Sequence, residues 1–189
     1  MKEIVLASNN SGKLAEIRAI LSDYRVVSPR DMNIDFDVEE TGQTFYDNAL
    51  IKARALYEIS GKPSIADDSG LCVDALDGAP GVFSARYSGG GDSDNIDKLL
   101  AELNGVKNRS AHFECCMVYY DGKDIISATG KAYGYITQER SGGGGFGYDP
   151  VFFSDDLGKT FGQASDKEKN AVSHRARALQ ALKDSLLLG

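Results

Sequence analysis

EIVLASNNSGK, residues 3–13, places a short apolar run directly before a polar loop near the start of the chain. Residues 3–7 are typical of a short buried strand. Beyond the loop, Leu14, Ile17 and Leu21 recur at the spacing of one helical face. The chain therefore begins as strand, loop and helix, which is the repeating unit of an α/β fold.

Further elements alternate in the same way. We expect a helix from Thr44, with Asp47 as its capping-box partner. Gly61-Lys62-Pro63 ends this helix, and a strand at residues 64–66 runs into the turn-like sequence Asp67-Asp68-Ser69-Gly70. The other expected elements are a helix carrying Ile96, Leu99, Leu100 and Leu103 and ended by Gly105, strands at 111–120 and 124–136 joined by a hairpin turn at Asp121-Gly122, a short strand at 151–153, and a last helix at 172–188. We therefore predict one α/β domain over residues 1–189, with a mixed sheet and no linker.

Composition excludes several classes of protein. Of the 189 residues, 42% are hydrophobic and 26% are charged, an ordinary globular balance that a disordered chain would not show. The net charge of −7 argues against non-specific binding to nucleic acid. The sequence contains no run of about 20 apolar residues, the length that a membrane span needs. The first residues also lack the pattern of a signal peptide, so we expect a cytoplasmic protein. The three cysteines have the spacing of neither a disulfide framework nor a zinc site.

The loop Ser8–Lys13 is a candidate anion site. It lies between a strand and a helix N-terminus, where backbone N–H groups lack intrahelical partners and the helix dipole is positive. Ser8, Asn10 and Lys13 add side-chain donors. Because the leading Gly and the final Ser or Thr of a Walker A loop are missing, an ordinary polar turn is the alternative.

Two pairs of adjacent acids lie within residues 31–77, a segment with 11 acidic and three basic residues. Asp67 and Asp68 would repel each other at a strand end unless they shared a cation or a proton. Mg²⁺ prefers carboxylate and phosphate oxygens together, and Glu39-Glu40 could reach the same ion. The alternative is an exposed Asp turn.

Two features near the C-terminal end could contact a ligand. Residues 142–145 are four glycines that precede Phe146, whose ring can stack on a base, and Asp149, which can accept from a purine N–H. A plain loop is the alternative. Arg175 falls within the apolar stripe of the last helix, so its inward guanidinium needs a partner. That partner is either a ligand at the start of the helix or an internal carboxylate.

Six motifs occur together and in order along the chain. They are Ala7-Ser-Asn-Asn-Ser-Gly-Lys13; Glu39-Glu-Thr-Gly42 with Asn48-Ala49 and Lys52-Ala53; Ala66-Asp-Asp-Ser-Gly-Leu71; Gly78-Ala-Pro-Gly81 with Ser84-Ala-Arg-Tyr-Ser-Gly89; Phe146-Gly-Tyr-Asp-Pro150; and Glu168-Lys-Asn-Ala171 with Ser173-His-Arg175. In these motifs the sequence resembles the inosine triphosphate pyrophosphatase family, also called XTP/dITP diphosphatase.

The resemblance implies Mg²⁺-dependent hydrolysis of purine nucleoside triphosphates with altered bases (ITP, dITP and XTP) to the monophosphate and pyrophosphate. It also implies an elongated mixed sheet flanked by helices, two lobes around a central nucleotide-binding cleft, and a homodimer. By motif, Asp68 is the proton acceptor and a metal ligand, and Glu39 is the second acidic ligand, with Glu40 as the alternative. The residues implied to bind substrate are Ser8, Asn9, Asn10, Ser11, Gly12, Lys13, Lys52, Ser69, Phe146, Gly147, Tyr148, Asp149, Lys169, His174 and Arg175.

Two other functions could use the same residues. A nucleotide-binding sensor would close on its ligand without turnover. A phosphatase would release the γ-phosphate instead of pyrophosphate. Measuring both products separates the three functions.

Overall fold

The computed structural model describes residues 2–188, and strands alternate with helices along most of this range. The strands are β1 (Lys2–Leu6), β2 (Tyr24–Val27), β3 (Ser64–Val73), β4 (Ser110–Tyr120), β5 (Ile125–Ile136), β6 (Phe152–Ser154) and β7 (Lys159–Thr160). The helices are α1 (Ser11–Ile20), α2 (Phe45–Ser60), α3 (Asp92–Glu102), α4 (Asp166–Val172) and α5 (His174–Leu188). Short 3₁₀ helices lie at η1 (Arg30–Met32), η2 (Asp74–Leu76), η3 (Gly81–Arg86) and η4 (Asp149–Val151).

The strands form a seven-stranded sheet in the order β2-β1-β3-β4-β5-β6-β7. β1 is parallel to both of its neighbours, with Val5 opposite Ser64 and Leu6 opposite Ile65 of β3. β6 is antiparallel to β5 and to β7. The sheet is therefore mixed, which confirms the predicted α/β class.

The chain divides into two compact units, each with its own hydrophobic core. Unit 1 comprises residues 1–68, 115–130 and 175–189, and unit 2 comprises residues 69–114 and 131–174. β3, β4 and β5 contribute residues to both units.

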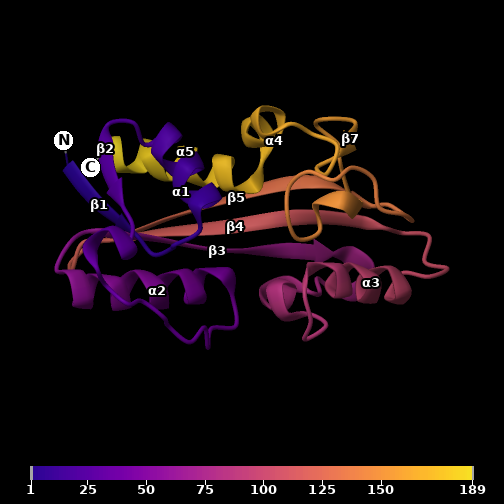
Figure 1. Cartoon of the computed structure of the whole chain (residues 1–189), viewed down its shortest axis with the longest axis horizontal. Coiled ribbons are helices and arrows are strands. Elements are labelled where there is room, and N and C mark those ends of the chain that lie inside the picture. The colour runs from indigo at the N-terminus through magenta and orange to yellow at the C-terminus, as the bar shows by residue number, and fades with distance from the viewer. Residues whose placement is uncertain (1, 189) are drawn as a thin grey trace. The chain divides into compact units, whose positions relative to one another are not determined.

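In unit 1, α1 and α5 cover one face of the strands and α2 covers the other (Figure 1). Strand residues alternate between the two faces, as the pleat of a β-strand requires. Ile4, Leu6 and Ile65 share a core with residues of α1 and α5, whereas Val5 packs with Leu56 of α2. By the same alternation, successive side chains further along β3 face either α1 and α5 or α2.

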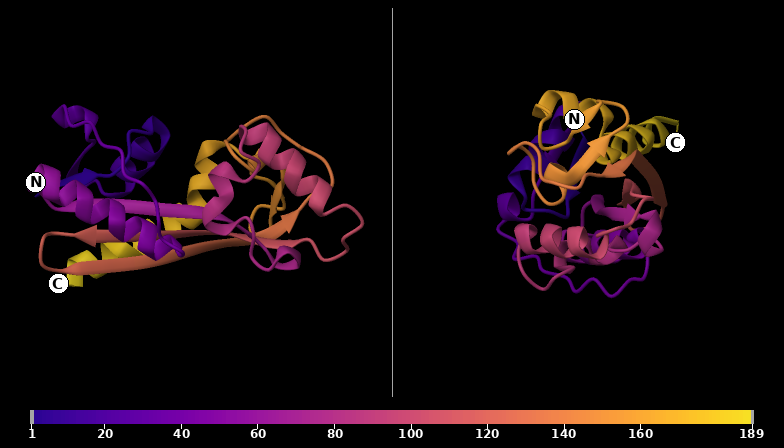
Figure 2. Two further views of the ribbon diagram at one scale, coloured as in Figure 1. Left: turned by 90° about the horizontal axis from the view of Figure 1, so that it is seen from below. Right: turned by 90° about the vertical axis from the view of Figure 1, so that its right-hand side faces the viewer.

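In unit 2, α3 and α4 lie on opposite sides of the strands (Figure 2). Ile96 and Leu99 present the apolar face of α3 to a core that includes Phe113 and Phe152. The ring centroids of these two phenylalanines are 4.6 Å apart. The predicted α3 is thereby confirmed, and Gly105 follows it with a positive φ of 76°.

Three predicted boundaries are wrong. The strand expected at 64–66 continues to Val73, so the Asp67–Gly70 segment lies inside a strand and not in a turn. The helix expected at 172–188 begins at His174, because Ser173 adopts an extended backbone, and Val172 ends the separate helix α4. The strand expected at 151–153 begins at Phe152, since Pro150 sits in the preceding 3₁₀ turn.

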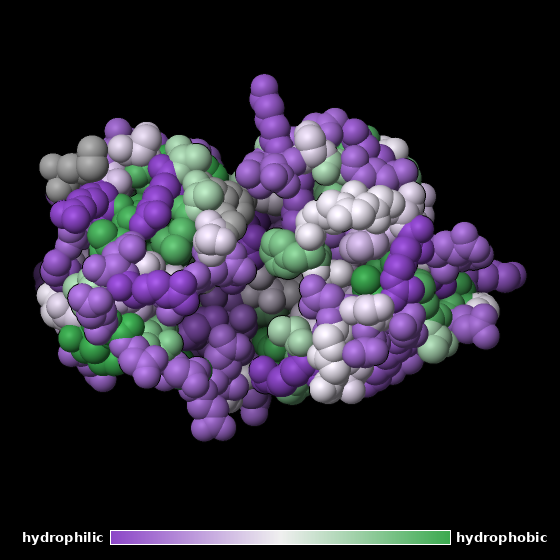
Figure 3. All heavy atoms as spheres, in the orientation of Figure 1, coloured by the Kyte–Doolittle hydropathy of each residue, from purple (hydrophilic) through white to green (hydrophobic). Residues whose placement is uncertain are grey.

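One face of the molecule carries separate apolar groups and no large continuous apolar patch among the residues that the structure describes (Figure 3). On the face shown in Figure 3, hydrophilic residues predominate and hydrophobic residues form small separate groups. Among residues 2–188, no helix has both the length and the apolar character needed to cross a bilayer.

Candidate active site

The adjacent aspartates of β3 lie on opposite faces of the strand. Ile65 packs toward α1 and α5, so Asp67 faces the same way and Asp68 faces α2. The contacts agree, since Asp67 pairs with Lys13 of α1 and Arg175 of α5. Asp68 instead contacts residues of α2. The exposed turn considered from the sequence is therefore wrong, because both carboxylates are buried within a strand.

Asp67 is neutralised by the protein itself. Its Oδ2 lies 2.9 Å from Nζ of Lys13 and 3.4 Å from Nε of Arg175, and the residue is 2% exposed. Burial alone would raise the pKa of Asp67, but the two cations outweigh it and hold the pKa well below its usual range. Of the two partners considered for the inward Arg175, a ligand and an internal carboxylate, this contact supplies the internal carboxylate.

Asp68 has a different environment. Its Oδ2 accepts a hydrogen bond from Nδ2 of Asn48 at 3.0 Å, and its Oδ1 lies 3.7 Å from Nζ of Lys52. Burial raises the pKa of Asp68, and the repulsion of Glu40 and Asp67 adds to the rise. Lys52 and Asn48 oppose this effect without cancelling it, so the pKa lies above its ordinary value. A carboxylate in this state is suited to accept a proton.

Lys52 connects Asp68 to the acidic loop before α2. Its Nζ lies 2.6 Å from Oε1 of Glu40. Burial would lower the pKa of Lys52, but the carboxylates of Asp68 and Glu40 outweigh burial, and the pKa is raised. Glu39 is exposed. The structure therefore brings Glu40, the alternative from the sequence, to the group around Asp68 in preference to Glu39.

The two carboxylates around Lys52 fit a Mg²⁺ ion that is delivered with a nucleotide. Residues 2–188 contain no group of three or more His, Cys, Asp or Glu side chains that could hold a metal ion. Mg²⁺ usually takes one or two protein carboxylates and completes its shell with substrate phosphates and water. Glu40 and Asp68, both in contact with Nζ of Lys52, supply that number of carboxylates.

The predicted phosphate loop is ordered by its own side chains. Oδ1 of Asn10 caps α1 by accepting from the backbone N–H of Lys13 at 3.0 Å, and Oγ of Ser8 accepts from the N–H of Asn10 at 3.1 Å. Oδ1 of Asn9 accepts from the backbone N–H of Arg30, which lies after β2, at 3.2 Å. Residues 11–12 form the first turn of the helix. The loop thus places a helix N-terminus and the Lys13 ammonium in one segment, as an anion site requires.

A second group of predicted residues gathers in unit 2. The ring of Phe146 is 56% exposed, and Nζ of Lys169 lies 4.5 Å from its centroid. Oδ2 of the buried Asp149 accepts from the N–H of Phe146 at 2.9 Å and from Nζ of Lys169 at 2.5 Å. Gly145 permits this approach, because a Cβ there would lie 2.0 Å from Oδ2 of Asp149. The group offers an exposed ring beside an ordered ion pair.

The remaining predicted substrate ligands have mixed surroundings. The N–H of Gly147 and the hydroxyl of Tyr148 both donate hydrogen bonds within unit 2. His174 is buried and stacks on Phe113, with ring centroids 4.8 Å apart. Ser69 is half-buried in β3.

Two features were given no role from the sequence although a signal was present. Asn48 lies four residues before the predicted ligand Lys52, which places both side chains on one helical face toward Asp68. Helix α4 begins with a capping box between Ser165 and Glu168. Both signals are local, and both could have been read from the sequence.

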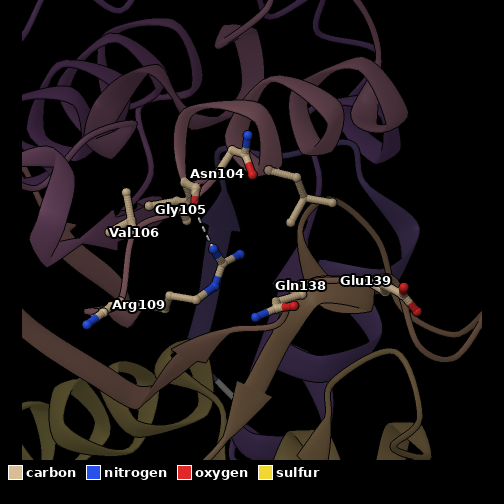
Figure 4. Close-up of a pocket in the computed structure, with 9 residues that line it drawn as sticks. Asn104, Gly105, Val106, Arg109, Gln138 and Glu139 are labelled. Atoms are coloured by element: carbon tan, nitrogen blue, oxygen red, sulfur yellow. Dashed lines mark hydrogen bonds between the residues drawn. The ribbon is translucent and has the colours of Figure 1, made fainter.

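A pocket of about 500 Å³ lies elsewhere in unit 2 (Figure 4). Its lining includes Asn104, Gly105, Val106, Arg109, Gln138 and Glu139. The guanidinium of Arg109 donates to the carbonyls of Leu103, Ile136 and Thr137. This arginine therefore ties the end of α3 to the end of β5, and the lining includes none of the predicted site residues.

Comparisons with known proteins agree with these motifs. The Ham1 family model matches residues 4–185. A dITP/XTP pyrophosphatase of Treponema denticola is 50% identical over 184 residues, covering 94% of each chain, and one of Pectobacterium atrosepticum is 47% identical, covering 98% of each. Among solved structures, a Ham1 protein of Staphylococcus aureus has a TM-score of 0.91 at 43% identity, covering 98% of each chain. A HAM1 protein of Coxiella burnetii has a TM-score of 0.92 at 40% identity, covering 100% of each. Sequence, fold and site residues thus lead to one conclusion: the chain belongs to the Ham1 family.

Proposed function

We propose that the chain hydrolyses ITP, dITP and XTP to the nucleoside monophosphate and pyrophosphate. The observation that carries this proposal is the group of Asp68, Lys52 and Glu40, which combines a proton acceptor, a cation and a second carboxylate. The N-terminus of α1 adds N–H donors and a positive dipole suited to phosphate. The names of relatives that are 50% and 47% identical, both called dITP/XTP pyrophosphatase, support dITP and XTP as substrates.

In this proposal the triphosphate is bound by Ser8–Lys13 and by Lys52. The contact with Asp67 orients the ammonium of Lys13, and the raised pKa of Lys52 keeps it protonated. Glu40 and Asp68 would hold Mg²⁺. When bound, Mg²⁺ neutralises phosphate charge, including the charge that develops on the departing pyrophosphate.

Asp68 orients the attacking water and accepts its proton. In this proposal the proton goes to Oδ1, which lies on the side of Lys52, while Oδ2 accepts from Asn48. The water oxygen forms a bond to the α-phosphorus as the bond from that phosphorus to the bridging oxygen breaks. Pyrophosphate leaves with the electron pair of the broken bond, and Asp68 holds the proton.

Residues within the range 146–175 supply base recognition in this proposal. The exposed ring of Phe146 stacks on the purine, and Asp149 accepts from its N–H. Inosine and xanthine carry a 6-oxo acceptor where adenine carries an amino donor. Lys169, His174 and Arg175 present donors, which pair with a carbonyl and oppose an amine. Arg175 contacts Asp67 through its Nε, and a guanidinium is a donor and never an acceptor, as recognition of a 6-oxo group requires.

A turnover panel tests the function. We expect pyrophosphate from ITP, dITP and XTP, slow reaction of ATP, and no matching release of inorganic phosphate. Binding of ITP without turnover would indicate a sensor, and phosphate release alone would indicate a γ-phosphatase.

Three further parts of the proposal come from the family resemblance stated above. They are Mg²⁺ as the cofactor, a homodimer as the assembly and a cytoplasmic location. The first two are tested below.

A further inference from the structure

A single buried asparagine contacts both acidic parts of the site. Asn48, on α2, is fully buried. Its Nδ2 donates to Oδ2 of Asp68 at 3.0 Å, and its Oδ1 accepts from the backbone N–H of Gly42 at 2.7 Å. One amide therefore connects the aspartate of β3 to the loop that carries Glu40.

The orientation of this amide follows from its partners. A backbone N–H only donates, so the oxygen of Asn48 must face Gly42. The amino group then faces Asp68, which must act as the acceptor. One oxygen of Asp68 is thereby held, and the other remains on the side of Lys52.

The loop backbone approaches Asn48 too closely for a side chain at position 42. A Cβ on Gly42 would lie 2.6 Å from Oδ1 of Asn48 and 2.9 Å from its backbone nitrogen. Two residues earlier in the same loop, Glu40 pairs with Lys52, which lies one helical turn after Asn48. Lys52 in turn reaches Asp68, so the contacts close a ring.

We propose that Asn48 is a positioning residue that sets the Asp68 carboxylate and the Glu40 loop in a fixed relation. This inference rests on the proposed function only for its kinetic consequence. Side chains that orient metal-binding carboxylates commonly affect metal affinity or activity by about 10–100-fold when they are replaced.

Two substitutions separate the two arms of the amide. Asn48→Asp keeps an acceptor for the N–H of Gly42 but replaces the donor to Asp68 with a second carboxylate oxygen, which repels the Asp68 carboxylate. Asn48→Ala removes both. For Asn48→Asp we expect kcat for ITP to fall about 10–100-fold and the Mg²⁺ concentration for half-maximal rate to rise, with KM for ITP changed less than about threefold.

Hydrogen exchange supplies a readout that does not depend on catalysis. Measured by mass spectrometry on the metal-free protein, exchange over residues 38–44 is expected to accelerate in Asn48→Ala and to stay near wild type in Asn48→Asp. The matched control is Asn95→Asp in α3, because Asn95 is also buried, accepts from the N–H of Ser88 at 2.8 Å and donates to the carbonyl of Ala85 at 3.2 Å. It should lower the melting temperature without shifting the Mg²⁺ dependence.

The outcomes distinguish the possible failures. Wild-type kcat and Mg²⁺ dependence in a folded Asn48→Asp protein would overturn the inference, as would unchanged exchange over residues 38–44 in Asn48→Ala. If Asn95→Asp shifts the Mg²⁺ dependence as much as Asn48→Asp does, the shift reflects general destabilisation, and the inference about Asn48 is also overturned. If wild-type protein releases no pyrophosphate from ITP, the proposed function fails, and the exchange measurement still decides whether Asn48 holds the loop.

Discussion

Asp67 and Asp68 are consecutive residues of β3 whose carboxylates have separate partners on opposite faces of the strand. Oδ2 of Asp67 lies 2.9 Å from Nζ of Lys13, and Oδ2 of Asp68 accepts from Asn48 at 3.0 Å. The pleat separates the two groups, and their surroundings shift their pKa values in opposite directions. Two neighbouring acids can therefore have different roles, one as an internal counter-ion and the other as a proton acceptor.

Asp68→Asn removes the proposed proton acceptor while keeping the side chain's size. We expect kcat for ITP to fall at least about 100-fold, the usual scale for loss of a general base. Pyrophosphate release at saturating ITP and Mg²⁺ measures this. Near-wild-type turnover in a folded variant would move the role to another residue.

Asp67→Asn should act mainly on stability, because it removes the buried carboxylate that pairs with the half-buried Lys13 and the buried Arg175. We expect the free energy of unfolding at pH 7, measured in urea with EDTA, to fall by about 3 kcal/mol or more. Asp97→Asn is the control, since Asp97 forms an exposed pair with Arg140 and should change stability by less than about 1 kcal/mol.

The effect of Asp67 should depend on pH in a defined direction. Its folded pKa lies below the unfolded value of about 4, so its contribution is complete above that pH and declines as the pH falls further. The difference between wild type and Asp67→Asn should therefore be smaller at pH 3 than at pH 7. A difference that grows toward pH 3 would contradict this assignment.

Turnover should require a divalent cation. Without one, the carboxylates of Glu40 and Asp68 would repel a triphosphate, and Lys52 alone would offset only part of their charge. Excess EDTA is expected to abolish pyrophosphate release and added MgCl₂ to restore it. Glu40→Gln should raise the Mg²⁺ requirement more than Glu39→Gln, since Glu39 is exposed. The reverse order would return the metal-ligand role to Glu39.

Arg175→Ala tests base choice. We expect kcat/KM for ITP to fall and the ratio of ITP to ATP activity to narrow, because donors that oppose the 6-amino group are lost. The ratio does not depend on the fraction of protein that is folded. If the ratio of ITP to ATP activity stays unchanged while ITP turnover falls, Arg175 binds phosphate. Asp149 and the backbone near Phe146 would then recognise the base.

If the protein is a homodimer, its mass in solution should be twice that of one 20.3 kDa chain. Light scattering after size-exclusion chromatography at micromolar concentration measures this mass. A monomer mass under these conditions would end the prediction.

Helix α2 shows how much a local sequence can determine. Thr44 and Asp47 form the predicted capping box, and Gly61 ends the helix with a positive φ of 65°. Each of these interactions joins residues at most four positions apart, so the sequence alone contains the information. The capping box of α4, between Ser165 and Glu168, joins residues three positions apart and is equally local.

The surroundings of Asp67 and Asp68 were decided only by the tertiary structure. From the local sequence alone, two adjacent aspartates followed by a glycine favour a turn. Here they lie within a strand because Asp67 meets Lys13 and Arg175, which are 54 and 108 residues away in the chain. Burial of a carboxylate is tolerable only with such partners, and no local pattern reports them. The sequence by itself therefore determined helices α1, α2, α3 and α5 and most strands, and it indicated candidate site residues, whereas packing decided which of the two acids is paired with internal cations and which is not.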